Sequence, residues 1–193
     1  MDAVIRERPF GEKQQVKKYF VFPVSLPDQA CYYAGNLNVM CCSGENESIK
    51  AMKLYLDMCV WKRPFDDQSD DRIWIESHAV RRILDLAHTG EVRIFVSMAL
   101  VLENERNPKA WRKHRVAALM ASFGRPAPLT AVILARAFDI RKMGFSDMDA
   151  LHLSFAENLK ATCFVTCDDA ILGRKGAVKI TIINPVDLLK EHK

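Results

Sequence analysis

The chain has 193 residues, of which 49% are apolar and 27% charged, and its formal net charge is +4. This length and apolar content suit one sizeable hydrophobic core, alone or with an extension. No apolar run approaches the roughly 20 residues that a membrane-spanning helix needs, and the early run at 19–24 is too short for a signal peptide. We therefore expect a cytoplasmic protein without a membrane partner.

Residues 1–51 differ from the rest of the chain. They show no sustained hydrophobic period and contain many Gly, Pro, Asn and Ser residues. Regular patterning begins at Met52, so we expect an irregular N-terminal extension at 1–51 and one patterned domain at 52–193. We hypothesise that Met52 is the natural start; N-terminal sequencing of the endogenous protein would contradict this by finding a product that begins at Met1. The alternative is an added regulatory segment.

The patterned part alternates short apolar strands with helices. Strands are predicted at 53–57, 93–97, 162–166 and 178–183, a loop at 61–71, and helices at about 70–88, from Ser97 past Glu103, at about 108–122, 130–143 and 146–160, and after Pro185. Apolar strands that alternate with helices predict an α/β fold, with a mainly parallel central sheet of four or five strands covered by helices on both faces.

Four acidic residues lie where these strands end or these helices begin. Asp57 closes the first strand, Glu103 lies in the helix after the second, Asp149 begins a helix, and Asp168 follows the third strand. Sites in parallel sheets form at the carboxyl ends of the strands, so the four acids can converge there. Gathered carboxylates repel one another unless a hard cation such as Mg²⁺ lies among them. The pattern therefore predicts metal-dependent hydrolysis of a phosphodiester bond.

Three of these acids also have a structural explanation. Asp149 stands three residues after a serine, which is the spacing of a helix capping box. Asp168 could cap a helix. Glu103 could lie on the surface, with Glu105 as the functional acid instead. Asp57 is the hardest to explain in this way, because a carboxylate directly after an apolar strand has few structural partners.

Three polar residues near the acids are further candidates. His152 follows Asp149 by three residues and shares its helix face; a buried, hydrogen-bonded histidine is its first interpretation, and a metal ligand or catalytic group its second. Thr166 and Ser97 could orient a ligand or a water molecule with their hydroxyl groups. Ser97 could equally act as a helix cap.

Basic residues gather in one part of the chain. Between Arg106 and Phe138 there are seven Lys or Arg residues and no acid. Such a stretch suits a polyanion such as RNA, although a solvated helix face explains it equally well. The candidate RNA-binding residues are Arg106, Lys109, Arg112, Lys113 and Arg115.

The order of these motifs resembles the PIN domain family. The segments are LYLDMCV, SMALVLE, SDMDALHLSFAE and FVTCDD, and the resemblance covers about 52–190. It implies a metal-dependent endoribonuclease, of the kind that acts as the toxin of a toxin–antitoxin pair, with an antitoxin partner and a homodimer as further expectations. The alternative is a degenerate PIN scaffold that binds RNA or protein without cleavage.

By resemblance, Asp57, Glu103, Asp149 and Asp168 form an acidic quartet around Mg²⁺ or Mn²⁺. The metal ligands would be Asp57, Asp149 and Asp168, with Thr166 and Ser97 as supporting hydroxyls. One departure concerns the two residues after Asp57. The family usually has Thr or Ser and then Asn there, whereas this chain has Met58 and Cys59, which removes a polar contact to the first acid.

Overall fold

The computed structural model describes residues 51–191, so the predicted extension at 1–51 lies outside the described residues except for Ala51. The described part is built on a four-stranded, entirely parallel sheet with the strand order β2–β1–β3–β4. Its strands are β1 (Met52–Leu56), β2 (Val92–Phe95), β3 (Cys163–Val165) and β4 (Thr181–Ile183). The predicted α/β fold class with a mainly parallel sheet is confirmed.

The central strand β1 is buried on both faces. Its residues Leu54, Tyr55 and Leu56 are all 0% exposed. Because side chains alternate between the two faces of a strand, a strand with both faces covered reads as a continuous apolar run. This explains why the segment before Asp57 shows no alternation of apolar and polar residues.

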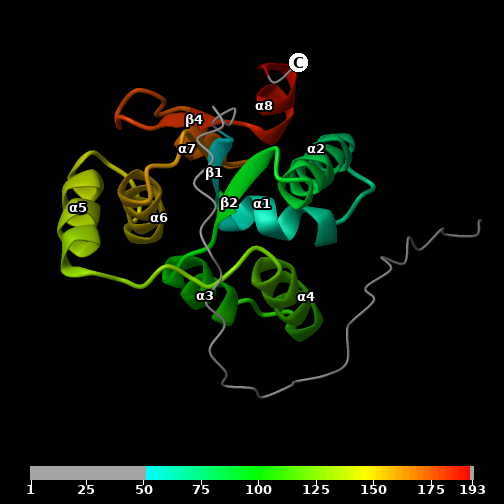
Figure 1. Cartoon of the computed structure of the whole chain (residues 1–193), viewed down its shortest axis with the longest axis horizontal. Helices are drawn as coiled ribbons and strands as arrows, with labels where there is room; N and C mark the ends of the chain where they lie inside the picture. Colours follow the sequence, from blue (N-terminus) through cyan, green and yellow to red (C-terminus); the bar gives the residue numbers. More distant parts are fainter. Residues whose placement is uncertain (1–50, 192–193) are drawn as a thin grey trace, which may run out of the picture. The chain divides into compact units, whose positions relative to one another are not determined.

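Helices cover both faces of the sheet. In Figure 1, α5 and α6 lie on one side of the strands, and α2 and α8 lie on the other. The helices of the described residues are α1 (Met58–Lys62), the 3₁₀ helix η1 (Arg63–Phe65), α2 (Asp71–His88), α3 (Met98–Glu105), α4 (Ala110–Ala121), α5 (Ala131–Lys142), α6 (Asp147–Asn158), α7 (Asp169–Leu172) and α8 (Pro185–Glu191). Each predicted helix is present, with ends shifted by a few residues. None of the described helices is long and apolar enough to cross a membrane.

Helices α1 and η1 were not predicted, and they occupy the first five residues of the expected loop at 61–71 and the residues before it. Asp57 caps α1, accepting a hydrogen bond from the Met58 backbone N–H. The indole of Trp61 is fully buried and donates to the Leu56 carbonyl oxygen at 3.1 Å. Because α1 is a single turn followed by Pro64 in η1, its apolar residues are too few to show a helical period.

Helices α3 and α4 form a layer beside the carboxyl end of the sheet. Ser97 caps α3 by accepting from the Leu100 N–H at 3.4 Å, so the predicted cap is confirmed. The buried Asn104 side chain donates to the Lys113 carbonyl oxygen at 2.9 Å and thereby joins α3 to α4. Helix α4 also packs against α1, and α3 packs against α6. This packing brings residues of α1, α3 and α6 to one end of the sheet.

Candidate metal centre

Asp57 lies at the carboxyl end of the central strand and is 5% exposed. Its Oδ1 accepts the Met58 backbone N–H at 2.7 Å, and its Oδ2 accepts the Thr166 hydroxyl at 2.8 Å. Its own backbone N–H donates to the Val165 carbonyl oxygen at 2.9 Å. No Lys or Arg of the described part of the chain forms an ion pair with this carboxylate. The side chain is therefore fixed in position, and its charge has no permanent cationic partner.

The residues after Asp57 correct one expectation. The Cys59 thiol donates to Asp57 Oδ2 at 3.1 Å and lies 3.3 Å from the Thr166 hydroxyl oxygen. Its contact with Cys167 and its burial raise the pKa of the Cys59 thiol well above its usual range, so it keeps the hydrogen that it donates. The departure from the family pattern thus replaces a polar contact to the first acid rather than removing it.

Glu103 approaches Asp57 from α3 and has two partners. The Lys62 ammonium contacts its Oε1 at 3.1 Å, and His152 Nε2 contacts its Oε2 at 2.8 Å. Glu105, the alternative acid, instead forms an ion pair with Lys113 at the surface, where its side chain is 60% exposed. Of these two acids, the structure therefore brings only Glu103 to the end of the sheet beside Asp57.

A buried chain of hydrogen bonds lies behind Glu103. The Tyr55 hydroxyl is 2.6 Å from the Ser97 hydroxyl and 2.8 Å from His152 Nδ1, and all three residues are 0% exposed. An ionised carboxylate can only accept, so the hydrogen in the pair with Glu103 lies on His152 Nε2. Both ring nitrogens of His152 are therefore engaged, and the ring can ligate a metal ion only by giving up one of these bonds.

The two neighbouring acids have opposite pKa shifts. Burial raises the pKa of the Asp57 carboxyl, and the charge of Glu103 adds to this rise against the opposing effects of His152, Cys59 and Thr166. Burial alone would also raise the pKa of Glu103, but its bonds and charge interactions with His152 and Lys62 outweigh burial and lower it. Neighbouring carboxyls with pKa values pushed apart are a feature of catalytic sites.

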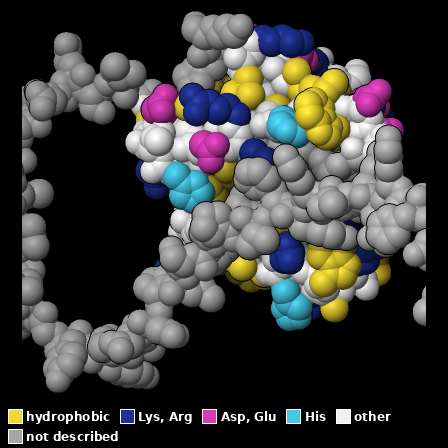
Figure 2. All heavy atoms as spheres, turned by 90° about the vertical axis from the view of Figure 1, so that its right-hand side faces the viewer, with side chains coloured by type: hydrophobic (Ala, Val, Ile, Leu, Met, Phe, Trp, Pro, Cys, Tyr) yellow, Lys and Arg dark blue, Asp and Glu magenta, His cyan; other side chains and the backbone are white. Residues whose placement is uncertain are grey.

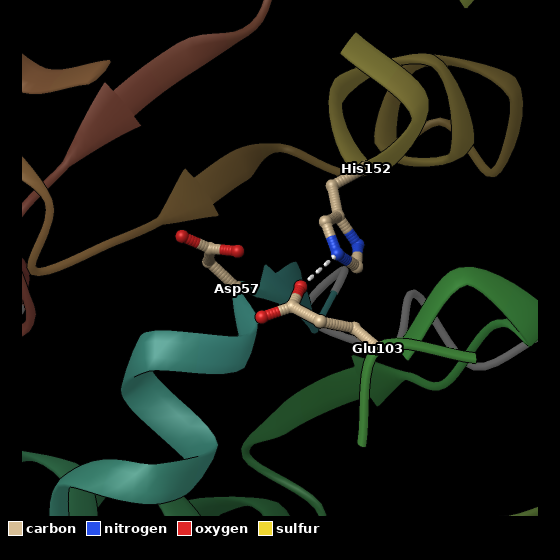
Figure 3. Close-up of side chains that lie close together, drawn as sticks. All are labelled: Asp57, Glu103 and His152. Carbon is tan, nitrogen blue, oxygen red and sulfur yellow. Dashed lines mark hydrogen bonds and ion pairs between the residues drawn. The ribbon is translucent and has the colours of Figure 1, made fainter. Parts of the chain in front are cut away.

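Asp57, Glu103 and His152 form the close group of this site. Each offers one ligand atom, and these atoms all lie within 4.8 Å of one another. Figure 3 shows Glu103 and His152 pointing toward each other, with the Asp57 carboxylate beside them. The two carboxylates offer the oxygen ligands that suit Mg²⁺ or Mn²⁺, whereas an imidazole suits ions such as Zn²⁺ better. The uncompensated charge of Asp57 fits a cation at this position.

The other two predicted acids do not belong to this close group. Asp149 lies in the first turn of α6, three residues before His152, and its backbone N–H donates to the Ser146 hydroxyl at 3.2 Å. Its carboxylate has no hydrogen bond or ion pair among residues 51–191. Asp168 is exposed and caps α7, accepting from the Ala170 N–H at 2.7 Å. The structural explanation of Asp168 as a helix cap is therefore confirmed, and the role of Asp168 as a metal ligand stays a prediction.

The predicted hydroxyl residues have different surroundings. Thr166 bonds directly to Asp57, as a supporting residue of a metal ligand would. Ser97 caps α3 and reaches the close group only through Tyr55 and His152. The sequence did not indicate Lys62 and Tyr55 as residues of this site. It indicated a metal-binding or catalytic role for His152 only as a second interpretation.

The candidate RNA-binding residues divide into two sets. Arg112 contacts Asp66 at 2.7 Å, and Lys113 contacts Glu105, so both already have acidic partners. The second set consists of exposed side chains that form no ion pair within the described range: Arg106, Lys109 and Arg115. These three cations are available to a polyanion.

Comparison with known proteins supports the fold. The parallel sheet, the helices on both of its faces and Asp57 at the carboxyl end of the central strand fit a PIN-like α/β fold. Among solved structures, the chain is similar to one in the crystal structure of VapBC2 from Rickettsia felis bound to a DNA fragment from their promoter. The sequence identity is 15%, the TM-score is 0.50, and the match covers 69% of this chain and 98% of that chain. No family model and no curated protein matches the sequence.

Proposed function

We propose that this protein is a metal-dependent endoribonuclease that hydrolyses RNA phosphodiester bonds. The observation that carries the proposal is the buried Asp57 carboxylate without a cationic partner, close to Glu103 at the carboxyl end of a PIN-like sheet. The solved neighbour shares the fold and belongs to a VapBC complex. The exposed cations Arg106, Lys109 and Arg115, which follow α3 and lie at the start of or within α4, support a polyanionic substrate.

In this proposal, Asp57 and Glu103 hold a Mg²⁺ or Mn²⁺ ion, and Asp149 and Asp168 are the further predicted ligands. When bound, such an ion orients and acidifies water and neutralises charge on the phosphate. Thr166, Cys59 and the Met58 N–H keep the Asp57 carboxylate in place. His152 and Lys62 fix the Glu103 carboxylate and keep it ionised.

A cleavage assay tests this function. The parent and the Asp57→Asn variant are incubated with labelled RNA in Mg²⁺ or Mn²⁺, and a chelator control is run beside them. We expect cleavage by the parent only, and only with metal. Glu105→Gln is a matched control, because it neutralises an acid two residues from Glu103 that lies outside the close group. Equal cleavage by the parent and Asp57→Asn would refute the mechanism.

One observation favours a second candidate, a PIN-like scaffold that binds without cleavage. Glu103 already has Lys62 and His152 as partners, so its charge is balanced without a metal ion. Titration with Mn²⁺, followed by calorimetry, separates the two functions. The nuclease should bind the ion, and Asp57→Asn should weaken this binding. No binding at millimolar Mn²⁺ would favour the scaffold.

We also propose that the protein acts as the toxin of a toxin–antitoxin pair. The support is the solved neighbour, whose VapBC2 complex is described as bound to DNA from their promoter. An antitoxin partner and a homodimer are part of this proposal. Co-expression with the product of the adjacent reading frame tests the pairing: it should relieve growth arrest caused by the parent, and Asp57→Asn alone should cause no arrest.

A further inference from the structure

Helix α4 presents three planar side chains to solvent. Trp111, His114 and Arg115 are all exposed, and their spacing of three and four residues places them on one face of the helix. Trp111 is 51% exposed and makes no ring contact with another aromatic side chain of the described residues. A large indole that lacks an aromatic partner is free to stack on a flat, unsaturated ring.

Helix α4 itself carries cations and no acid, and two of these cations pair with acids of neighbouring segments. No acidic residue occurs between Arg106 and Phe138. Arg112 and Lys113 are directed to Asp66 and Glu105, whereas Arg115 forms no ion pair within residues 51–191. Figure 2, which views the side where α2 and α4 lie in Figure 1, shows basic, histidine and hydrophobic side chains exposed near one another, together with several acidic ones. The face of α4 therefore combines an aromatic surface with uncompensated positive charge.

A second exposed tryptophan provides a comparison. Trp74 on α2 is 50% exposed, almost the same as Trp111. Its ring, however, lies 4.0 Å from the His78 ring, centroid to centroid, and it follows the acidic residues Asp70 and Asp71. The two tryptophans are thus similarly exposed, but Trp74 has a ring partner and acids in the preceding turn, so Trp111 suits a polyanion better.

We propose that the exposed face of α4, formed by Trp111, His114 and Arg115, is a stacking platform for the unpaired bases of single-stranded RNA. Trp111 stacks on a base, His114 stacks beside it, and Arg115 contacts the backbone phosphates. Aromatic residues interleaved with cations bind single strands because every base has a π-face, whereas bases paired in a duplex are stacked on each other.

The helix that carries the platform packs against elements of the candidate metal centre. Helix α4 packs against α3, which carries Glu103, and against α1, which Asp57 caps. The bonds from Asn104 to the Lys113 carbonyl and from Arg112 to Asp66 hold the helix in this position. A strand bound on the outer face of α4 is thus separated by this one helix from the elements that carry the acids. This inference rests on the proposed ribonuclease function and names its substrate as unpaired RNA.

The test measures binding separately from cleavage. The full chain with Asp57→Asn is titrated with a fluorescein-labelled short oligoadenylate and with the matching duplex, and anisotropy is recorded. We expect the single strand to bind more tightly than the duplex. Trp111→Ala should weaken single-strand binding by roughly 5- to 150-fold, because base stacking contributes about 1–3 kcal/mol per base. Trp111→Phe should keep most of the affinity.

Two controls separate stacking from charge and from exposure. Trp74→Ala removes the same kind of exposed side chain and should leave binding unchanged. Arg115→Ala should reduce the slope of log K against log salt by about 0.7, the value for one phosphate contact on a single strand. Trp111→Ala should leave that slope unaltered. Quenching of tryptophan fluorescence by RNA should persist in Trp74→Ala and disappear in Trp111→Ala.

The outcomes are distinct. Equal losses for Trp111→Ala and Trp74→Ala, or equal binding of the single strand and the duplex, would overturn the platform. Loss of binding to a partner protein by Trp111→Ala, with no RNA binding by the parent, would make this face a protein interface and also overturn it. If the expected binding pattern appears but the parent never cleaves RNA, the stacking platform is supported and the proposed nuclease function is refuted. Cleavage with unchanged binding by Trp111→Ala refutes the platform alone.

Discussion

Replacing Tyr55 by Phe tests the buried hydrogen-bond chain behind Glu103. The phenyl ring stays stacked on Phe164, with ring centroids 5.7 Å apart, so hydrophobic burial is unchanged. The substitution removes the hydroxyl that lies 2.6 Å from Ser97 Oγ and 2.8 Å from His152 Nδ1. Both partners are 0% exposed and cannot turn to water. Since each buried polar group left unpaired costs about 1–3 kcal/mol, we expect a loss of roughly 2–4 kcal/mol in the free energy of unfolding.

Urea unfolding followed by circular dichroism measures this loss. The urea concentration at the unfolding midpoint should fall. The slope of the free energy of unfolding against urea concentration should stay constant, because the surface exposed on unfolding is the same. A double-mutant cycle with Ser97→Ala isolates one bond and should give a coupling of about 0.5–3 kcal/mol. A loss below about 0.5 kcal/mol for Tyr55→Phe would refute the reasoning, because the hydroxyl would then have no buried bond to lose.

Three further predictions follow from the site and its surroundings. Glu103→Gln should abolish RNA cleavage, whereas Glu105→Gln should leave it near the parent rate; equal rates for both variants would contradict the geometry. Burial raises the pKa of the Asp57 carboxyl, so the native state binds a proton at this carboxyl more tightly than the unfolded chain does. The free energy of unfolding of the metal-free protein should therefore fall as pH rises through that raised pKa. Asp57→Asn should lack this fall in urea titrations across the same range. Glu76 is 3% exposed and contacts Arg63 at 3.0 Å, so Glu76→Ala should lower the free energy of unfolding by roughly 3–5 kcal/mol; a loss near zero would show that the pair is not needed.

Much of the fold could be predicted from the sequence because its signals are local. The four apolar strands, the caps Ser97 and Ser146, and Pro185 at the start of α8 each act within a few residues of themselves. Parallel order followed from the alternation of strands with helices. The place of Asp57 at the end of β1 followed in turn, since no residue separates it from the strand.

The composition of the close group could not be predicted in the same way. His152 joins it because α6 packs against α3, and that contact depends on the relative placement of two helices. Lys62 reaches Glu103 from the end of α1, a helix too short to leave a periodic signal. The choice between Glu103 and Glu105 was equally a matter of helix rotation, because the two positions face different directions on α3.

The position of β1 in the middle of the sheet has a consequence for how the chain folds during synthesis. Asp57 bonds to Thr166, 109 residues later in the sequence, and Glu103 bonds to His152, 49 residues later. Contacts of such long range form slowly and only after the distant segment is available. Thr166, which follows β3, must therefore leave the ribosome before it can donate to the Asp57 carboxylate. A nascent or truncated chain that ends before β3 should therefore lack the assembled site.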